Sequence, residues 1–193
     1  NAYNLLAVYA VADLFELGTI ETLQYLSELE SVGGRFQYFI SEEKITAIVD
    51  YAHTPDALKN VLETINTIRT GNENLITVVG CGGDRDKTKR PVMANIASTL
   101  STKAIFTSDN PRTEDPKKII EEMEAGVEPQ NYNKTISIED RKQAIKTACQ
   151  FATSNDIILI AGKGHETYQE VNGVKNDFDD LKVVKELLIN VKK

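Results

Sequence analysis

The sequence predicts an α/β protein whose core is a doubly wound, mostly parallel sheet, with two helices ahead of it. From residue 35 onward, short apolar runs alternate with longer amphipathic stretches, which is typical of strands joined by crossover helices. Four of the apolar runs end in glycine-rich or charged residues that a turn alone does not need. The carboxyl ends of parallel strands lie at one edge of a sheet, where open α/β sheets bind ligands. We therefore expect a binding site at that edge.

Length and composition narrow the class of protein. A chain of 193 residues accommodates one domain of about 150 residues and an appendage. The net charge of -7 and the absence of a long basic run argue against a nucleic-acid partner. No apolar run reaches the roughly 20 residues that span a bilayer, and the first residues do not resemble a signal peptide. We expect a soluble, cytoplasmic protein with no membrane partner.

The two cysteines, Cys81 and Cys149, lack the spacing of a metal site. A chain with this much apolar content does not need a disulfide to hold its core. We therefore predict two free thiols and no metal site.

The first 30 residues predict two helices. Apolar residues recur at helical spacing over residues 2–17, with Gly18 as the expected stop and Thr19 as the expected cap of a second helix over residues 20–30. Two helices with no strand beside them cannot make a domain. We therefore interpret residues 1–32 as the end of a domain that begins upstream, residues 33–193 as a second domain, and residues 31–34 as the hinge between them.

The next elements are a strand pair and a helix. Residues 35–40 and 45–50 predict two strands of an edge hairpin, because a polar turn separates them. Thr54 and Pro55 then form a typical helix start, a hydroxyl cap followed by proline. This helix is expected to end near residue 69.

The stretch on which the prediction depends most is residues 75–91. An apolar run over 75–79 is followed by Gly-Cys-Gly-Gly at 80–83 and by mainly charged residues at 84–90. Three glycines in four residues allow positive φ angles and close approach of the backbone to a ligand. A tight strand-to-helix turn would explain the same glycines, so both interpretations stay open.

The remaining elements continue the alternation. Residues 139–152 predict a helix with Phe151 among its inward residues, and the sequence Val-Asn-Gly-Val at 171–174 predicts a hairpin turn. The other expected elements are strands at 104–107, 134–138 and 157–161, and helices at 91–100, from 116 and at 181–191.

Taken together, the four strand ends resemble the carboxyl-terminal domain of the Mur ligases. The stretches are Asp-Tyr-Ala-His-Thr-Pro at 50–55, the glycine loop at 80–83, Asp-Asn-Pro-Arg at 109–112 and Gly-Lys-Gly-His-Glu at 162–166. The resemblance spans nearly the whole chain, and residues 1–7 are similar to the segment that closes the family's central ATPase domain. Within the family, the sequence is most similar to members that add a diamino acid to a UDP-linked muropeptide.

The resemblance implies an amino-acid site for meso-diaminopimelate. This substrate carries two ammonium and two carboxylate groups, so its pocket needs both cations and anions. Arg112 lies where lysine-adding members usually lack arginine, and Pro111 would stiffen its loop, so we expect meso-diaminopimelate rather than lysine. The residues that match the family's site are Arg85, Asp109, Asn110, Pro111, Arg112, Gly162 and Glu166.

The resemblance also implies nucleotide-binding residues. Asn4 matches a residue that contacts adenine, Arg35 one that reaches the ATP phosphates, and Asp50 one that meets the ribose. His53, Lys163 and His165 are expected only to position their neighbours. The contribution of this domain would be positioning rather than acid–base catalysis, so we assign no catalytic residue.

The cofactors implied by the resemblance are ATP and Mg²⁺, held mainly by a central domain outside this chain. No stretch fits the phosphate-cradling pattern Gly-x-x-x-x-Gly-Lys-Ser/Thr. We therefore expect this chain to fold but to be inactive alone. Its expected partners are meso-diaminopimelate, ATP, the UDP-N-acetylmuramoyl dipeptide and its own central domain, and we expect a monomer.

Three alternatives stay open: a lysine-adding member, another amide ligase such as a folylpolyglutamate synthetase, and a non-enzymatic Rossmann-type nucleotide-binding module. Against the last, the glycine spacing is not Gly-x-Gly-x-x-Gly, and no acidic residue ends a strand about 20 residues later. The stretches at 109–112 and 162–166 argue against the folylpolyglutamate type.

Overall fold

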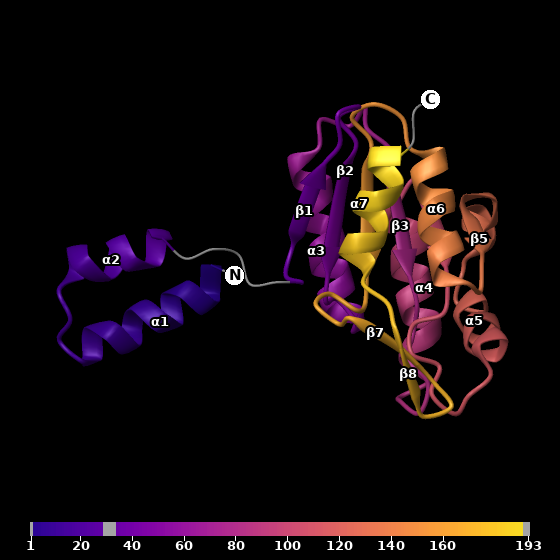
Figure 1. Ribbon diagram of the computed structural model, residues 1–193, viewed down its shortest axis with the longest axis horizontal. Helices are drawn as coiled ribbons and strands as arrows, with labels where there is room; N and C mark the ends of the chain where they lie inside the picture. The colour runs from indigo at the N-terminus through magenta and orange to yellow at the C-terminus, as the bar shows by residue number, and fades with distance from the viewer. Residues whose placement is uncertain (1, 29–33, 191–193) are drawn as a thin grey trace. The chain divides into compact units, whose positions relative to one another are not determined.

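The computed structural model describes residues 2–28 and 34–190 of the chain. These residues form two compact units, one within residues 1–32 and one within residues 33–193 (Figure 1). Each unit is described by itself.

The first unit contains α1 (Ala2–Leu14) and α2 (Thr19–Glu28). α1 ends earlier than the sequence predicted, because Glu16 has a left-handed φ of 57°. The carbonyl of Gly18 accepts the Thr22 N–H at 2.9 Å, so Gly18 starts α2 rather than stopping α1. Many large apolar side chains are exposed within this unit: Leu6, Val8, Val11, Leu14, Phe15, Leu17, Ile20 and Leu23.

The second unit is built on a six-stranded sheet in the order β1-β2-β6-β3-β4-β5. β1 lies at one edge and pairs antiparallel with β2, and all the other neighbours pair in parallel. The prediction of a mostly parallel sheet with an edge hairpin is therefore confirmed. The strands are β1 (Gln37–Ile40), β2 (Thr46–Asp50), β3 (Leu75–Val79), β4 (Lys103–Phe106), β5 (Thr135–Ser137) and β6 (Ile157–Ala161).

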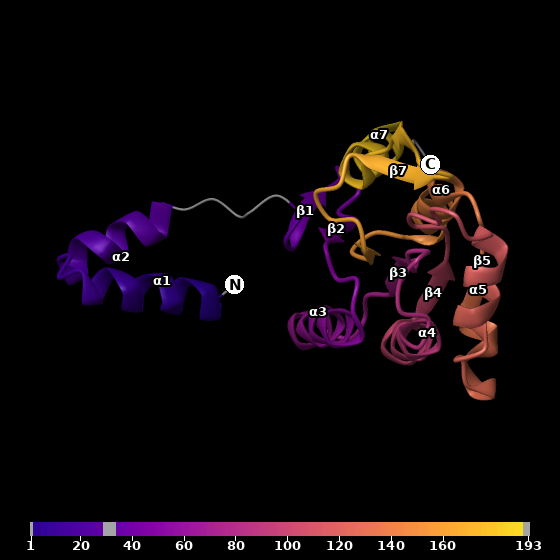
Figure 2. The same ribbon diagram turned by 90° about the horizontal axis from the view of Figure 1, so that it is seen from below.

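Helices cover both faces of this sheet. Figure 2 shows α3 (Pro55–Ile68) and α4 (Lys89–Leu100) on the face opposite α6 (Arg141–Phe151) and α7 (Asp180–Asn190). α5 (Pro116–Glu124) buries Ile119 and Met123 in the same apolar cluster as α3 and α4. A separate cluster joins α6 and α7 to the other face. The sheet is doubly wound, as the sequence predicted.

β6 shows why this arrangement is stable. The strand lies between β2 and β3, and all five of its residues are buried. Leu159 packs toward α3 and α4, whereas Ile158 and Ile160 pack toward α6 and α7. A strand covered on both faces needs a continuous apolar run, and residues 157–161 provide it.

Several details differ from the sequence prediction. α6 begins at Arg141 rather than 139, because the Asp140 carboxylate caps it by accepting the Gln143 N–H at 2.7 Å. Phe151 is 42% exposed, so its expected inward position is wrong, and the Lys103 ammonium lies 5.2 Å from its ring centroid. A 3₁₀ helix over Pro129–Lys134 was not predicted.

A separate two-stranded hairpin follows the sheet, formed by β7 (Tyr168–Val171) and β8 (Val174–Asp177). Its predicted turn is confirmed, because Asn172 and Gly173 both have the positive φ angles that a tight hairpin turn requires. The hairpin is fastened to the loop after β4: the Arg112 N–H donates to the Glu170 carbonyl at 3.1 Å, and the Asn172 N–H donates to the Arg112 carbonyl at 2.7 Å.

Two further predictions concern the cysteines and membranes. Cys81 and Cys149 are free and buried, and burial raises the pKa of each thiol to about 12. Neither thiol is therefore reactive near neutral pH. No helix among the described residues is both long and apolar enough to cross a bilayer.

Candidate amino-acid site at the carboxyl edge of the sheet

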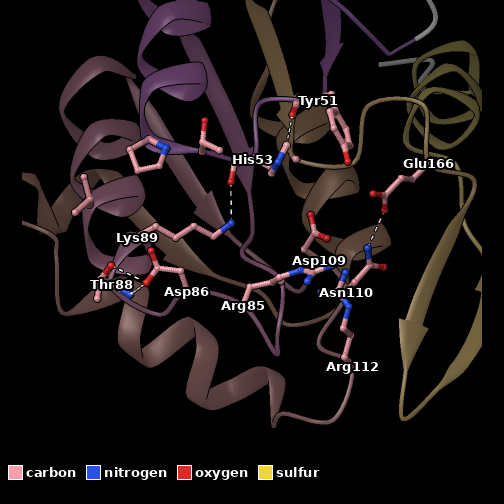
Figure 3. Close-up of a pocket in the computed structure, with 15 residues that line it drawn as sticks. Tyr51, His53, Arg85, Asp86, Thr88, Lys89, Asp109, Asn110, Arg112 and Glu166 are labelled. Carbon is pink, nitrogen blue, oxygen red and sulfur yellow. Dashed lines mark hydrogen bonds between the residues drawn. The ribbon is translucent and has the colours of Figure 1, made fainter.

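All four polar strand ends meet at one cavity of about 620 Å³ (Figure 3). β2 contributes the loop that carries His53, β3 the glycine loop, β4 the loop with Asp109, and β6 the loop with Glu166. Of the sequence-predicted amino-acid residues, Arg85, Asp109, Asn110, Arg112, Gly162 and Glu166 all line it.

The glycine loop has a different role from the one expected. Gly80, Gly82 and Gly83 are not among the glycines with positive φ; Asp84, at 53°, is the left-handed residue. Instead, a Cβ at Gly80 would lie 2.3 Å from the Thr107 carbonyl oxygen, and one at Gly83 would lie 1.9 Å from that of Pro111. Gly80 and Gly83 are needed because the loops after β3 and β4 pack backbone to backbone, whereas Gly82 lines the cavity.

Arg112 is held by both neighbours of its loop. Its NH1 donates to the Gly83 carbonyl at 2.7 Å, and its Nε lies 3.7 Å from the Glu170 carboxylate on β7. Arg112 has a left-handed φ of 53°, and the two backbone hydrogen bonds to the β7–β8 hairpin hold it there. The rigidity that we expected from Pro111 therefore also comes from the hairpin, which sequence reasoning did not connect to this site.

The loop after β6 brings a carboxylate to the cavity and a buried cation beneath it. Gly162 has a φ of 117°, and a Cβ there would lie 2.6 Å from Asp109 Oδ2, so glycine is required on both counts. The Lys163 side chain is fully buried, and its Nζ donates to Asn110 Oδ1 at 2.9 Å. Asn110 Nδ2 in turn donates to Glu166 Oε2 at 2.8 Å.

Several charges at this edge have bonding capacity to spare. The Asp109 side chain, in a residue only 8% exposed, accepts no hydrogen bond from any described residue. Arg85 is exposed, and its guanidinium donates to none of them. Glu166 Oε1 likewise accepts no hydrogen bond in the described part of the chain. Two carboxylates and a guanidinium with open positions can bind a ligand that carries both ammonium and carboxylate groups.

The opposite end of the cavity contains a lysine that sequence reasoning missed, next to the predicted His53. Lys89, the first residue of α4, donates from Nζ to the His53 carbonyl at 2.9 Å, which joins the loops after β2 and β3. His53 Nδ1 lies 2.8 Å from the Tyr51 carbonyl oxygen. His53 is thus a hydrogen-bonded loop residue, as its expected positioning role requires. The charge of the run at 84–90 was the available signal for Lys89.

Arg35, Asp50 and His165 gather around Tyr51. The Arg35 guanidinium lies 5.6 Å from the centroid of the Tyr51 ring, and the centroid of the His165 ring lies 5.2 Å from it. One oxygen of Asp50 is already occupied, because Oδ2 accepts the Phe36 N–H at 2.7 Å. Burial raises the pKa of Asp50 above its usual 3.8, against the opposing effect of backbone N–H donors.

Two predicted features fall elsewhere. Asn4 lies exposed on α1, in the first unit, and is described there by itself. Of the expected hinge at 31–34, residues 31–33 lie outside the described residues. Gly34 does not act as part of a loose linker: its carbonyl accepts the Tyr51 N–H at 2.9 Å, and a Cβ there would lie 2.1 Å from the His165 nitrogen.

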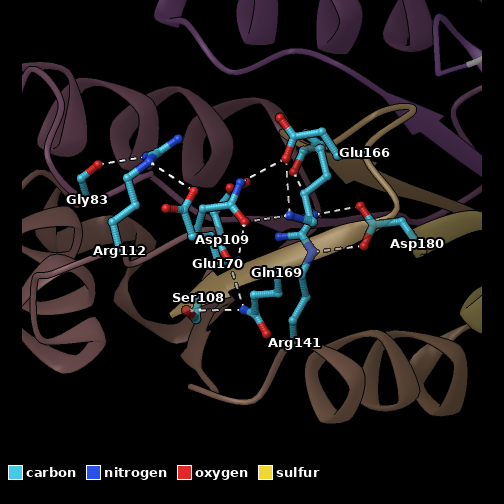
Figure 4. A network of polar contacts seen from close by, with 12 residues as sticks. Gly83, Ser108, Asp109, Arg112, Arg141, Glu166, Gln169, Glu170 and Asp180 are labelled. Atoms are coloured by element: carbon cyan, nitrogen blue, oxygen red, sulfur yellow. Dashed lines mark hydrogen bonds and ion pairs between the residues drawn. The ribbon is translucent and has the colours of Figure 1, made fainter. Parts of the chain in front are cut away.

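A buried ion pair lies beneath the site (Figure 4). Arg141 donates to both oxygens of Asp180 at 2.8 Å, and its NH2 also donates to the Ala161 carbonyl at the end of β6. Burial alone would lower the pKa of Arg141, but the Asp180 carboxylate outweighs this effect and the pKa is raised. Arg141 NH1 is buried and has no hydrogen-bond partner among the described residues. No local pattern in the sequence indicates this pair, because its members are 39 residues apart.

A second charged cluster joins the glycine loop to α5. Arg90 is fully buried and donates to Glu114 at 2.8 and 3.0 Å and to Glu122 at 2.6 Å. Lys87 adds an ion pair with Glu114 at 3.1 Å. The hydrogen bonds from Arg90 lower the pKa of Glu114 from 4.5 to about 2. We call this set, Lys87, Arg90, Glu114 and Glu122, the Arg90 cluster.

Comparison with known families identifies the second unit. The sequence profile described as "Mur ligase, glutamate ligase domain" matches residues 34–164. A solved structure of a UDP-N-acetylmuramoyl-L-alanyl-D-glutamate--2,6-diaminopimelate ligase superposes with a TM-score of 0.75 at 41% identity, covering 97% of this chain and 38% of that one. A folylpolyglutamate synthase/dihydrofolate synthase from Yersinia pestis shares the fold, with a TM-score of 0.55 at 19% identity over 75% of this chain and 32% of that one.

Curated relatives agree with this result. Ligases described by the same 2,6-diaminopimelate name are 59% identical in Cytophaga hutchinsonii and 49% identical in Halalkalibacterium halodurans, in both cases over 97% of this chain. The chain spans 38% of the length of each of these relatives. With the profile matching most of the chain, we conclude that it belongs to the Mur ligase family, whose glutamate ligase domain matches residues 34–164.

Proposed function

We propose that this chain is the carboxyl-terminal, amino-acid-binding part of an ATP-dependent ligase that adds meso-diaminopimelate to UDP-N-acetylmuramoyl-L-alanyl-D-glutamate in peptidoglycan precursor synthesis. One observation carries the proposal: the cavity at the carboxyl edge brings two arginines, Arg85 and Arg112, together with two carboxylates, Asp109 and Glu166. The names of its relatives supply the same substrate.

The geometry fits a molecule with charges of both signs at both ends. Asp109 and the open oxygen of Glu166 are suited to accept hydrogen bonds from ammonium groups, and Arg85 and Arg112 are suited to pair with carboxylates. Lysine lacks one of the two carboxylates of diaminopimelate. A site that holds an arginine for that carboxylate discriminates against lysine, because the arginine would lose its partner.

In this proposal the amino-acid site acts by positioning. ATP transfers its terminal phosphoryl group to a carboxylate of the UDP-linked dipeptide and leaves as ADP. The amine of diaminopimelate then attacks the acyl carbon, and the amide bond forms as the bond to phosphate breaks and the amine loses a proton. Holding the amine in line for this attack lowers the activation free energy, because the reactants are already oriented.

ATP and Mg²⁺ would be held mainly by a central domain outside this chain. Among the described residues, no three or more His, Cys, Asp or Glu side chains cluster to hold a metal ion. In keeping with this division, we assign residues 1–32 to the end of that central domain, and Asn4, Arg35 and Asp50 to contacts with the nucleotide. The monomeric state and cytoplasmic location remain predictions.

The test uses the full-length enzyme with ATP and the UDP-linked dipeptide. We expect release of ADP and a product of the mass expected for meso-diaminopimelate addition, with little product from L-lysine. Preference for lysine, or turnover of a folate with glutamate instead, would overturn the proposal. Binding of a nicotinamide cofactor without ligase activity would favour the Rossmann-type alternative.

The isolated chain provides a second test. We expect it to give a cooperative unfolding transition but no ATP-dependent amide formation, because it contains no phosphate-cradling stretch. Amide formation by the isolated chain would refute the assignment of the ATP machinery to another domain.

A further inference from the structure

Lys163 lies beneath the amino-acid cavity and does not line it. Its side chain is fully buried, whereas that of Glu166, three residues later, is 19% exposed. Lysine is rarely buried in this way unless it is paired. Its ammonium group therefore needs hydrogen-bond partners, and these are two residues that line the cavity, Asn110 and Glu166.

The hydrogen bonds around Lys163 fix two neighbouring side chains. Lys163 Nζ donates to Asn110 Oδ1 at 2.9 Å and lies 3.3 Å from Glu166 Oε2. Asn110 Oδ1 also accepts the Glu170 N–H at 2.9 Å, so both of its acceptor positions are used. This oxygen must therefore face Lys163, which leaves Asn110 Nδ2 to donate to Glu166 Oε2 at 2.8 Å.

As a consequence, only one of the two carboxylate oxygens of Glu166 is occupied within the described part of the chain. Its Oε2 takes both donors, whereas Oε1 accepts no hydrogen bond from the described residues. Asn110 Nδ2 likewise has a second hydrogen to donate. The open acceptor Glu166 Oε1 and the open donor Asn110 Nδ2 are thus held in a fixed position relative to each other at the cavity.

We propose that Lys163 is a positioning residue for the diamino acid substrate. It fixes the orientation of the Asn110 amide and the Glu166 carboxylate, so that Glu166 Oε1 accepts a hydrogen bond from a substrate ammonium group and Asn110 donates one to a substrate oxygen. This inference rests on the proposed function.

The experiment is Lys163→Met in the full-length enzyme, which keeps a long side chain but removes every donor. Loss of a hydrogen bond to a charged group predicts a rise of about 10- to 100-fold in the KM for meso-diaminopimelate. The KM values for ATP and the UDP-linked dipeptide should stay within about twofold of the parent. A purely structural role would move all three values together or lower the folded fraction.

Lys175→Met is the matched control. Lys175 lies over the same Tyr168 ring, at 4.3 Å from its centroid compared with 5.6 Å for Lys163. It makes no contact with Asn110 or Glu166 in the described part of the chain. We expect its three KM values to match those of the parent.

A double-mutant cycle separates action through Glu166 from an independent effect. If Lys163 acts through this carboxylate, Lys163→Met in a Glu166→Gln background should add much less than it does alone. Full additivity, or an unchanged KM for meso-diaminopimelate in Lys163→Met, would overturn the inference. Lys163→Gln keeps an NH2 group that can donate but removes the charge. If Lys163→Met does not fold, Lys163→Gln must raise the KM for meso-diaminopimelate, and not the other two KM values, for the inference to stand. A parent enzyme that does not use meso-diaminopimelate would instead overturn the proposed function.

Discussion

Two regions of the second unit each pair a buried cation with a partly exposed glutamate, but the two glutamates differ in their hydrogen bonding. In the Arg90 cluster, a fully buried cation pairs with Glu114, whose side chain is 18% exposed. In the loop after β6, the fully buried cation Lys163 pairs with Glu166, whose side chain is 19% exposed. Burial and charge are thus matched, so neither property separates the two regions.

What differs is how many acceptor positions are filled. Glu114 Oε1 accepts from the Asp84 N–H and from Arg90, and Oε2 accepts from Arg90 and Lys87. Both oxygens of Glu114 are occupied, whereas Glu166 keeps Oε1 open. An open acceptor position on a held carboxylate thus indicates a ligand site, and a carboxylate with every position filled indicates a structural role. Substitutions in the two regions should therefore affect different measurements.

The largest effect is expected from Arg112→Ala, on the ligand side of the comparison. Truncating one member of a desolvated charge pair costs on the order of 2 to 5 kcal/mol of binding, which corresponds to a rise of about 30-fold or more in the KM for meso-diaminopimelate. Steady-state kinetics of the full-length enzyme would measure it, with the affinity for ATP nearly unchanged. Unaltered diaminopimelate kinetics would show that this interpretation of the site is wrong.

Arg69→Ala is the matched control for that substitution. Like Arg112, Arg69 donates from NH1 to a backbone carbonyl, that of Glu73 at 3.0 Å. It does not line the cavity. We expect a small loss of stability and unchanged kinetics.

The second prediction concerns the saturated region. Arg90→Met leaves Glu114 and Glu122 without their buried partner, which should lower the free energy of unfolding by about 3 kcal/mol. Urea denaturation of the isolated chain would measure the loss. Arg90→Lys should recover only part of it, because a single ammonium group cannot reach both carboxylates as the guanidinium does. If Arg90→Met instead raised the KM for the amino acid without loss of stability, the contrast between the two regions would fail.

Glu114→Gln should have a smaller effect, and one that depends on pH. At neutral pH the lost charge-assisted hydrogen bonds should cost about 1.5 kcal/mol of stability. The folded carboxyl, facing Arg90 and Lys87, has a pKa of about 2 compared with 4.5 unfolded. The stabilisation is thus complete above pH 4.5 and is lost as the pH falls from 4.5 toward 2. The free energy of unfolding, measured by urea denaturation at several pH values, should fall less between pH 4.5 and 2 for Glu114→Gln than for the parent. An equal fall in both proteins would contradict the prediction.

The smallest effect is expected from Lys87→Ala. Its side chain is 61% exposed, and its ion pair with Glu114 is therefore worth at most about 0.5 kcal/mol. The same denaturation assay in high salt should give the parent and the variant equal stability. A loss as large as that of Arg90→Met would mean that exposure does not govern the strength of these pairs.

Most of the fold could be predicted because it follows from local signals. The apolar run at 157–161 predicted β6 to the residue, and Thr54 with Pro55 predicted the start of α3. The prediction was wrong where residues distant in the sequence decide whether a side chain is buried. Phe151 satisfies the helical spacing of α6, yet it lies at the exposed end of that helix beside Lys103.

The sequence by itself determined at which edge the candidate site lies, because parallel strands bring their carboxyl ends to one edge and four such ends carried polar residues. It could not determine what those residues do there. The glycines at 80–83 serve contact between two loops, Arg112 is aimed by a hairpin more than 50 residues later, and Lys163 faces Asn110 rather than the cavity. Such roles depend on which hydrogen-bonding positions remain open after distant segments pack together, and only the tertiary structure decides that.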